Sequence, residues 1–201
     1  MRKRSDGLTL IELLVVLLII ATLILIAIPP MLKARLRAEV ARTQQDLQVV
    51  ESALEWYFLD YQAYPESSGA DLLYRSRGEN HWGLRRLTQH KYLDHVPEDR
   101  FKDDALVLPG AAVYQFGSSG RPNGKTGRAA PIPAWILVSC GPDNDTDTLY
   151  ADQYPFGTVV WEYDPTLGAR SDGDIIRYGG DWDRGNWYLN SKQIKEPEPK
   201  K

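Results

Sequence analysis

The feature that most constrains this chain is an apolar run from Leu8 to Ile28 that keeps one carboxylate, Glu12, near its start. Residues 8–28 contain sixteen Leu, Ile or Val residues, which together favour membrane insertion by about 5 to 10 kcal/mol. A carboxylate at the centre of a membrane helix costs roughly 3 kcal/mol, and less near the interface. The run is therefore predicted to span a membrane and to carry Glu12 as a partly buried charge that needs a cationic partner.

The charges that flank this run predict its orientation. Residues 2–4 are all basic, and positive residues stay cytoplasmic, so the N-terminus is expected inside and the rest of the chain outside. Three cations after the run oppose this rule: Lys33, Arg35 and Arg37. They do not change the predicted orientation, because long domains translocate largely regardless of charge. A cleaved signal peptide and a generic signal anchor are the alternatives. The first has a shorter apolar core, of about 7–15 residues, followed by a small-residue cleavage site.

Composition excludes some classes of protein. The 201 residues carry a net charge of −3, and the acidic excess lies outside the basic N-terminus, so no nucleic-acid partner is expected. Cys140 is the one cysteine, which excludes an internal disulfide. We expect it to be a buried thiol on a strand, with an intermolecular disulfide as the alternative.

A second periodic pattern continues beyond the apolar run. Apolar residues recur there at three- and four-residue steps, which predicts an amphipathic helix; they are Leu32, Leu36, Val40, Leu47, Val50, Leu54 and Phe58, with Thr43 in the missing place. We therefore expect one long helix over residues 8–61, with its transmembrane part at 8–28. Pro29 and Pro30 lie in its middle and lack backbone donors, so a kink or a locally unwound segment is expected there.

The rest of the chain is predicted to form one globular α+β domain over residues 62–194, followed by a disordered tail at 195–201. Short helices are expected around residues 70–74 and 83–92. Runs rich in β-branched and aromatic residues predict four strands, at residues 112–116, 135–140, 158–163 and 175–178. A small antiparallel sheet of these strands needs a partner for its apolar face, and the amphipathic half of the helix is the obvious one.

Most motifs that suggest catalysis have simpler explanations. Gly120–Thr126 nearly matches a phosphate-binding loop but lacks its first glycine, so we interpret it as a solvated hairpin loop. His81, His90 and His95 lack metal-ligand spacing with the cysteine. Two acidic pairs, Glu98-Asp99 and Asp103-Asp104, are interpreted as surface charge rather than as a general acid and base. A membrane-anchored enzyme outside the cytoplasm remains the alternative class.

The segment Gly7-Leu8-Thr9-Leu10-Ile11-Glu12, followed by the apolar run, resembles the processing and methylation motif of type IV pilins and type II secretion pseudopilins. The resemblance implies that residues 1–7 are a leader, that a prepilin peptidase cuts after Gly7, and that Leu8 becomes the methylated N-terminus. It also makes Glu12 the main assembly carboxylate, and pairing with the new amine of a neighbouring copy would meet its need for a cation. The family usually has Phe where this chain has Leu8.

Later landmarks resemble the major pseudopilin in particular. These are Tyr64-Pro65, Tyr92-Leu93, residues 96–99, residues 114–116 and two acidic segments, 139–143 and 171–175. The acidic residues of the segments Gly141–Asp147 and Ser171–Ile175 alternate on turns, and clustered carboxylates can supply the six to eight oxygens that calcium takes. Thr148 and Tyr154 break the EF-hand pattern. The resemblance nevertheless implies a calcium site, with Asp143, Asp145, Asp172 and Asp174 as ligands; simple turn chemistry is the alternative.

The fold class expected from this resemblance is α+β and type IV pilin-like, with a long N-terminal helix packed on a small antiparallel sheet. The expected function is that of a non-enzymatic structural subunit, which polymerises into the pseudopilus of a type II secretion system. A type IV pilin or minor pilin for adhesion, motility or DNA uptake is the alternative. The expected partners are further copies, minor pseudopilins, the prepilin peptidase and an inner-membrane assembly platform. The chain is expected in the inner membrane before assembly and in a periplasmic filament afterwards.

Overall fold

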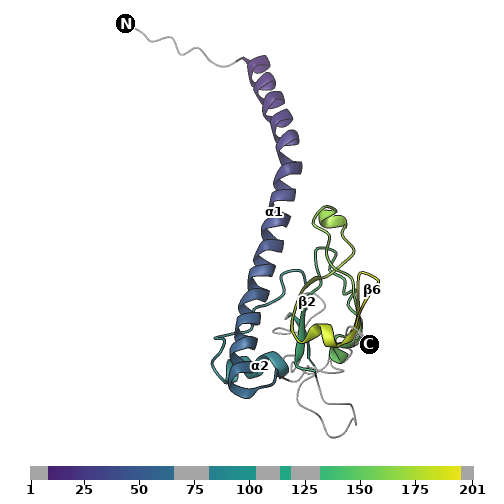
Figure 1. The fold of residues 1–201 in the computed structure, drawn as a ribbon. Helices are drawn as coiled ribbons and strands as arrows, with labels where there is room; N and C mark the ends of the chain where they lie inside the picture. The colour runs from purple at the N-terminus through teal and green to yellow at the C-terminus, as the bar shows by residue number, and fades with distance from the viewer. Residues whose placement is uncertain (1–8, 66–81, 103–113, 119–131, 196–201) are drawn as a thin grey trace. The chain divides into compact units, whose positions relative to one another are not determined.

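The computed structural model describes residues 9–65, 82–102, 114–118 and 132–195 (Figure 1). These residues form the predicted α+β fold, in which one long N-terminal helix accompanies small sheets. The chain divides into two compact units, Met1–Ala38 and Glu39–Lys201. The division falls inside the long helix, α1 (Leu10–Tyr61), because α1 residues become buried only beyond the boundary.

In the first unit, α1 runs through Pro29 and Pro30 without a break in its helical assignment. The alternative of a locally unwound segment is therefore wrong. The fixed φ of proline, about −65°, is itself helical, so each proline removes a hydrogen bond without forcing the chain out of the helix. A kink at Pro29 and Pro30 stays a prediction. All described residues before Leu36 in this unit are exposed.

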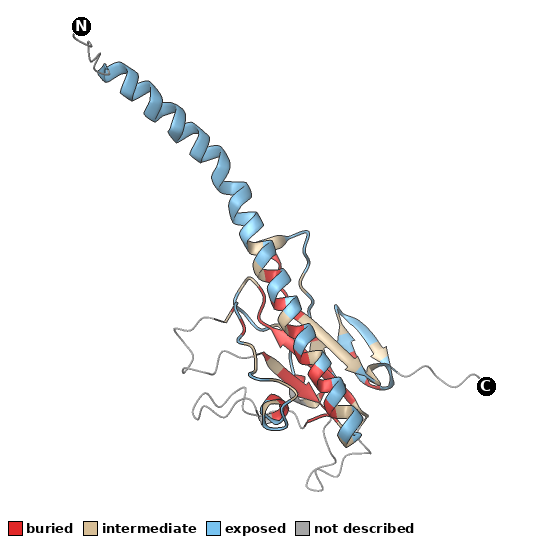
Figure 2. Cartoon of the chain, turned by 90° about the vertical axis from the view of Figure 1, so that its left-hand side faces the viewer, coloured by how far each residue is buried: buried red, intermediate tan, exposed pale blue. Residues whose placement is uncertain are grey.

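In the second unit, one face of α1 is buried, as Figure 2 shows in red. The buried residues are Val40, Thr43, Leu47, Val50, Ala53, Leu54 and Tyr57. This confirms the predicted stripe from Val40 to Leu54. Leu32 and Leu36 are not buried, and Tyr57 is buried where the sequence indicated the half-buried Phe58. Complete burial of Leu47, Val50 and Leu54 contributes roughly 5 to 9 kcal/mol, an upper value because the unfolded chain already buries some surface.

The first sheet contains β1 (Gln115–Ser118), β2 (Ala134–Ser139) and β4 (Ile175–Gly180), with β2 in the centre and both pairs antiparallel. Every residue of β2 is buried, because the strand is covered on both faces. Trp135 lies toward α1, where its Nε1 donates a hydrogen bond of 3.0 Å to Glu55 Oε1. Ile136 and Val138 lie on the other face, in an apolar cluster with residues that follow β2.

That cluster is completed by a second sheet. Its strands are β3 (Phe156–Val160), β5 (Asn186–Leu189) and β6 (Lys192–Lys195), in that order. The strand predicted at residues 158–163 belongs to this second sheet, so its expected place in one antiparallel sheet with the other strands is wrong. The β3–β5 pair is parallel, and the β5–β6 pair is antiparallel. Val160 and Trp187 of this sheet are completely buried against β2. In the second unit, the first sheet therefore has α1 on one face and the second sheet on the other.

Several expected boundaries move. Lys195 belongs to β6, so its assignment to a disordered tail is wrong. The predicted helix at residues 83–92 is α2 (Trp82–Gln89), which ends earlier. Short 3₁₀ helices lie at η3 (Ala151–Gln153), η4 (Gly168–Arg170) and η5 (Trp182–Arg184). The following predictions concern residues outside the described ranges: the helix around 70–74, the strand start at 112–113, the loop Gly120–Thr126, His81, Asp103-Asp104 and the tail beyond residue 195.

Candidate functional site

The start of α1 is fixed by a reciprocal pair of side chains. Thr9 precedes the first helical residue, and its hydroxyl accepts a hydrogen bond of 3.3 Å from the backbone N–H of Glu12. The Glu12 carboxylate in turn accepts hydrogen bonds from the backbone N–H of Thr9, at 3.4 Å, and from its hydroxyl, at 3.3 Å. This is a capping box, in which two helix-terminal donors are satisfied together. Gly7 and Leu8, the predicted processing residues, lie outside the described residues.

Glu12 therefore has a local partner as well as an exposed position. A negative charge in the first helical turn is favoured by the helix dipole, so the carboxylate is stable there before any other chain arrives. The capping role was not foreseen, although the spacing of Thr9 and Glu12 is its sequence signature. The arrangement leaves Glu12 accessible to a cation from another molecule.

The surface of this part of α1 is apolar and exposed. Among the described helices, α1 is the one long and apolar enough to cross a membrane, and its apolar window is not covered by other parts of the chain. The large side chains between Leu10 and Ile28 are at least 46% exposed. Such a surface needs lipid or other helices around it, which agrees with membrane anchoring.

The two acidic loops lie together in the second unit. One loop, residues 141–148, leaves the end of β2, and the other, residues 171–174, leads into β4. The antiparallel pairing of Ser139 with Ile175 places these two loops at the same end of the first sheet. One carboxylate oxygen from each of Asp143, Asp147 and Asp172 then lies within 4.8 Å of the others.

This group, which we call the carboxylate cluster (Asp143, Asp147 and Asp172), differs from the ligand set expected from the sequence. Asp143 and Asp172 are brought together as expected. Asp145 and Asp174 are not in the group, while Asp147 takes part in it. Asp145 accepts a hydrogen bond of 2.8 Å from the backbone N–H of Thr146.

Asp174 holds the two loops together through hydrogen bonds. It is completely buried. Its Oδ2 accepts hydrogen bonds from the backbone N–H of Asp147, at 3.1 Å, and from both the N–H and the hydroxyl of Thr148, at 2.7 and 2.6 Å. Burial raises the pKa of Asp174 to about 7, although the Thr148 hydrogen bonds act in the opposite direction. Asp174 therefore positions the loop from which Asp147 projects.

The loops also depend on a close backbone approach at Gly141. This residue has a φ of 71°, and a Cβ added there would lie 2.6 Å from the carbonyl oxygen of Gly173. The backbone N–H of Gly173 donates a hydrogen bond of 3.1 Å to Asp143 Oδ2. A side chain at position 141 would push the two loops apart and open the carboxylate cluster.

The electrostatics of the cluster favour a cation. Burial raises the pKa of Asp147, and the charges of Asp172, Asp143 and Asp145 raise it further. Two buried carboxylate oxygens, Asp147 Oδ2 and Asp174 Oδ1, have no hydrogen-bond partner among the described residues. Asp147, whose Oδ2 has no donor among these residues, lies with carboxylate oxygens of Asp143 and Asp172, and such a set matches the ligand preference of a hard divalent cation such as calcium.

Asp99, by contrast, is a structural residue, and its interpretation as surface charge is wrong. It is 4% exposed. Its carboxylate accepts hydrogen bonds from Ser139 Oγ at 2.7 Å, the Cys140 N–H at 3.1 Å and the Phe101 N–H at 3.1 Å. Asp99 thereby ties the segment before it to the end of β2. Cys140 is a buried free thiol, as expected, but it lies directly after β2 and not on a strand; burial raises the pKa of its thiol.

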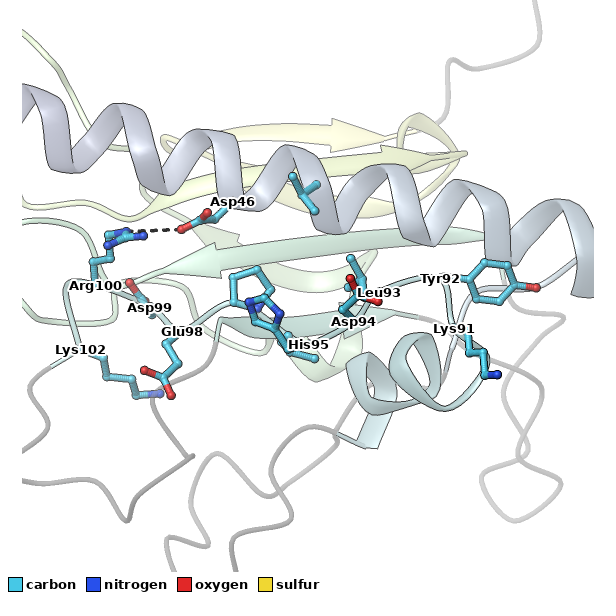
Figure 3. A pocket seen from close by; sticks show the side chains of 13 residues that line it. Asp46, Lys91, Tyr92, Leu93, Asp94, His95, Glu98, Asp99, Arg100 and Lys102 are labelled. Carbon is cyan, nitrogen blue, oxygen red and sulfur yellow. Dashed lines mark ion pairs between the residues drawn. The ribbon is translucent and has the colours of Figure 1, made fainter.

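An open groove of about 850 Å³ lies between α1 and residues 91–102 (Figure 3). Its wall contains an ion pair between Arg100 and Asp46, with a distance of 3.4 Å from Nε to Oδ2. Charges of both signs line it, together with apolar residues such as Val49 and Leu93. Because its charges are mixed and Asp99 is committed to structural hydrogen bonds, the groove does not resemble an acid–base site.

Comparison with known families identifies relatives of the chain. A family model described as type II secretion system (T2SS), protein G, matches residues 31–135, and one described as the prokaryotic N-terminal methylation motif matches residues 2–28. Similar proteins carry the name type II secretion system core protein G. The one from Aeromonas hydrophila is 32% identical over 142 residues, which cover 68% of this chain and 96% of the relative.

Two further relatives of the same name give the same picture. The protein of Escherichia coli (strain K12) is 29% identical, over 67% of this chain and 93% of its own length. The protein of Vibrio cholerae serotype O1 is 29% identical, over 68% of this chain and 95% of its own length. No solved structure matches the chain. The residues matched by the secretion family model end inside β2, so the acidic loops and the second sheet lie outside them.

Proposed function

This chain belongs to the type II secretion system protein G family, and we infer from this that it is a structural subunit that polymerises into the pseudopilus of a type II secretion system. The observation that carries the inference is the presence of both family signatures on one chain, at residues 2–28 and 31–135. The relatives are named for the secretion system, which favours a pseudopilus over a type IV pilus.

The role is structural rather than catalytic. The family is one of structural pseudopilins. The acidic residues that lie close to β2 serve to hold segments together: Asp99 fixes the end of β2, and Glu55 of α1 accepts the hydrogen bond of Trp135. Catalysis needs groups aimed at a substrate, whereas these groups are aimed at neighbouring segments of the chain.

Processing precedes assembly in this proposal. Prepilin peptidase removes residues 1–7 by cutting after Gly7, and the new N-terminus at Leu8 is methylated. The methylation motif match covers this site. Before assembly, the chain crosses the inner membrane once through residues 8–28, with its N-terminus in the cytoplasm and residues beyond the helix in the periplasm. The assembly platform and minor pseudopilins are its further partners.

Assembly then uses Glu12. Its carboxylate is exposed at the start of α1, within reach of a neighbouring subunit. The N-terminal amine of that neighbour, made by cleavage before Leu8, supplies the cation. Within the low dielectric of packed helices, such a pair is much stronger than in water, and an unpaired charge is costly. The pair therefore selects the register in which helices add to the filament.

Calcium is proposed to stabilise the periplasmic part of the subunit. The carboxylate cluster, Asp143, Asp147 and Asp172, would hold the ion. The buried Asp147 Oδ2 has no donor among the described residues, and the Asp147 pKa is raised by burial and then by the charges of Asp172 and Asp143; both observations support this assignment. When bound, the ion supplies positive charge between the two loops. Asp174 acts as the residue that positions them.

The function is tested by gene deletion in the host bacterium. Without this chain, proteins that the system normally exports should accumulate in the periplasm, and the wild-type gene should restore export. A matched variant, Glu12→Leu, should reach the membrane but fail to restore it. Normal export in the deletion strain would contradict the proposed function.

A further inference from the structure

The second unit exposes large apolar side chains in two separate places. Beyond α1, those among the described residues all fall between positions 149 and 188: Leu149, Tyr150, Phe156, Trp161, Leu167 and Tyr188. On the part of α1 that belongs to this unit, the exposed ones are Val49, Trp56 and Leu59. Contiguous apolar surface on a folded unit marks an interaction site.

The first surface is the outer face of the second sheet. Leu149 bridges Val159, and Val159 is also the register partner of Tyr188, so these three side chains form a row across neighbouring strands. Trp161 lies directly after the end of β3 and follows Val159 by two residues, which is the spacing of one strand face. Leu149, Trp161 and Tyr188 are 52%, 42% and 38% exposed. We give the name second-sheet face to four residues: Leu149, Val159, Trp161 and Tyr188.

This face is distinct from the core. The residues that alternate with it, Val160 and Trp187, are completely buried against the first sheet. The second sheet thus already has one side satisfied, and its second-sheet face is additional apolar surface. It also lies outside the residues matched by the secretion family model, which end at Trp135.

The second surface is on α1. Val49, Trp56 and Leu59 are spaced by seven and three residues, which places them on one side of a helix. Leu47, Val50 and Leu54 occupy the opposite, buried side. In Figure 2, this part of α1 has an exposed side in pale blue and a buried side in red. Trp56 and Leu59 are 64% and 61% exposed. We call Val49, Trp56 and Leu59 the helix stripe.

An open filament requires two different surfaces on each copy, because a heterologous contact joins one patch to another and then repeats. We propose, resting on the pseudopilus function, that the helix stripe of one copy packs on the second-sheet face of a neighbouring copy. Packing a helix on a sheet face is a standard way to bury both. The stripe spans eleven residues, or about 15 Å of helix, and the row from Leu149 to Tyr188 crosses two strand spacings, or about 10 Å.

The test uses cysteine crosslinking of full-length chains in filaments. In a Cys140→Ser background, a chain carrying both Trp56→Cys and Tyr188→Cys should form a ladder of disulfide-linked oligomers on oxidation. Each single cysteine variant should not. The matched control combines Trp56→Cys with Asp183→Cys, since Asp183 is exposed in η5 but is not part of the second-sheet face; it should give no ladder.

A second measurement uses charge. Tyr188→Glu should lower filament yield about tenfold, as loss of an aromatic anchor does, and Trp56→Lys should do the same. The two changes combined should recover yield, because they create an opposite-charge pair across the contact. Filaments without the mixed ladder, or with crosslinks between two Trp56→Cys positions, would overturn the inference while leaving the proposed function intact. A wild-type chain that forms no filaments would refute both.

Discussion

The capping box at the start of α1 allows the charge of Glu12 to be separated from its role in the helix. Glutamine at this position preserves the box, because the motif accepts Glu or Gln three residues after the cap. Glu12→Gln should therefore keep the hydrogen bonds with Thr9 and remove the negative charge alone. Membrane insertion should be at least as favourable, since an ionised group has been removed from the segment.

The expected loss appears only in assembly. A hydrogen bond to a charged partner contributes about 1.5 to 3 kcal/mol, so the affinity of a subunit for the growing filament should fall by roughly tenfold to a hundredfold. The assay is the yield of sheared filaments, normalised to the amount of processed subunit in the membrane. Glu12→Leu should be at least as defective, because it removes the capping partner as well.

The matched control is Thr9→Ala. This variant loses the cap, at about 1 kcal/mol of helix stability, but keeps the Glu12 charge. Its filament yield should remain close to that of the wild type. Wild-type yield from Glu12→Gln would refute the pairing argument. Equal defects in Thr9→Ala and Glu12→Leu, with a normal yield from Glu12→Gln, would show that Glu12 acts through the helix start instead of through a neighbour.

Three further predictions concern processing and the periplasmic part. Gly7→Val should leave the leader attached, because a side chain blocks the peptidase site, and intact-mass measurement of the membrane-extracted protein should then start at Met1. For a fragment of residues 34–201, calcium at one hundred times Kd should add about 2.7 kcal/mol of stability and raise Tm by roughly 5 to 11 °C. Asp172→Asn should abolish this shift in Tm, and Asp145→Asn should retain it. Identical melting curves in calcium and in chelator would rule the calcium site out. In the same fragment, Asp99→Ala leaves three donors without their acceptor and should cost about 3 kcal/mol, or roughly 6 to 12 °C in Tm; an unchanged Tm would refute its structural role.

Strong periodic patterns made the long helix and the first sheet predictable. The stripe from Val40 to Leu54 has helical spacing and is buried, and β2 is an unbroken apolar run that is covered on both sides. The second sheet was harder to predict. Its strands β5 and β6 have four residues each, and β6 contains polar residues, Lys192 and Gln193, that are also common in loops. β5 becomes a strand through its tertiary pairing with β3, which joins residues about thirty positions apart, and β6 then pairs with β5 alone.

The candidate sites show the same limit. The local motif around Glu12 could be recognised from the sequence, and its Thr9 partner lies at a spacing that could also have been recognised. The carboxylate cluster depends on how two loops meet across the β2–β4 pair, and sequence spacing does not determine which carboxylates point inward. That is why Asp147 joins Asp143 and Asp172, while Asp174 is turned toward the backbone of Thr148.

The most direct test of the central claim, that this chain is a processed pseudopilus subunit, is the intact mass of the protein in filaments. Filaments sheared from producing cells should be visible by electron microscopy, and their main component should be this chain, beginning at Leu8 with one added methyl group. A chain that retains Met1 and stays as an unpolymerised membrane protein, while export proceeds normally, would contradict the account.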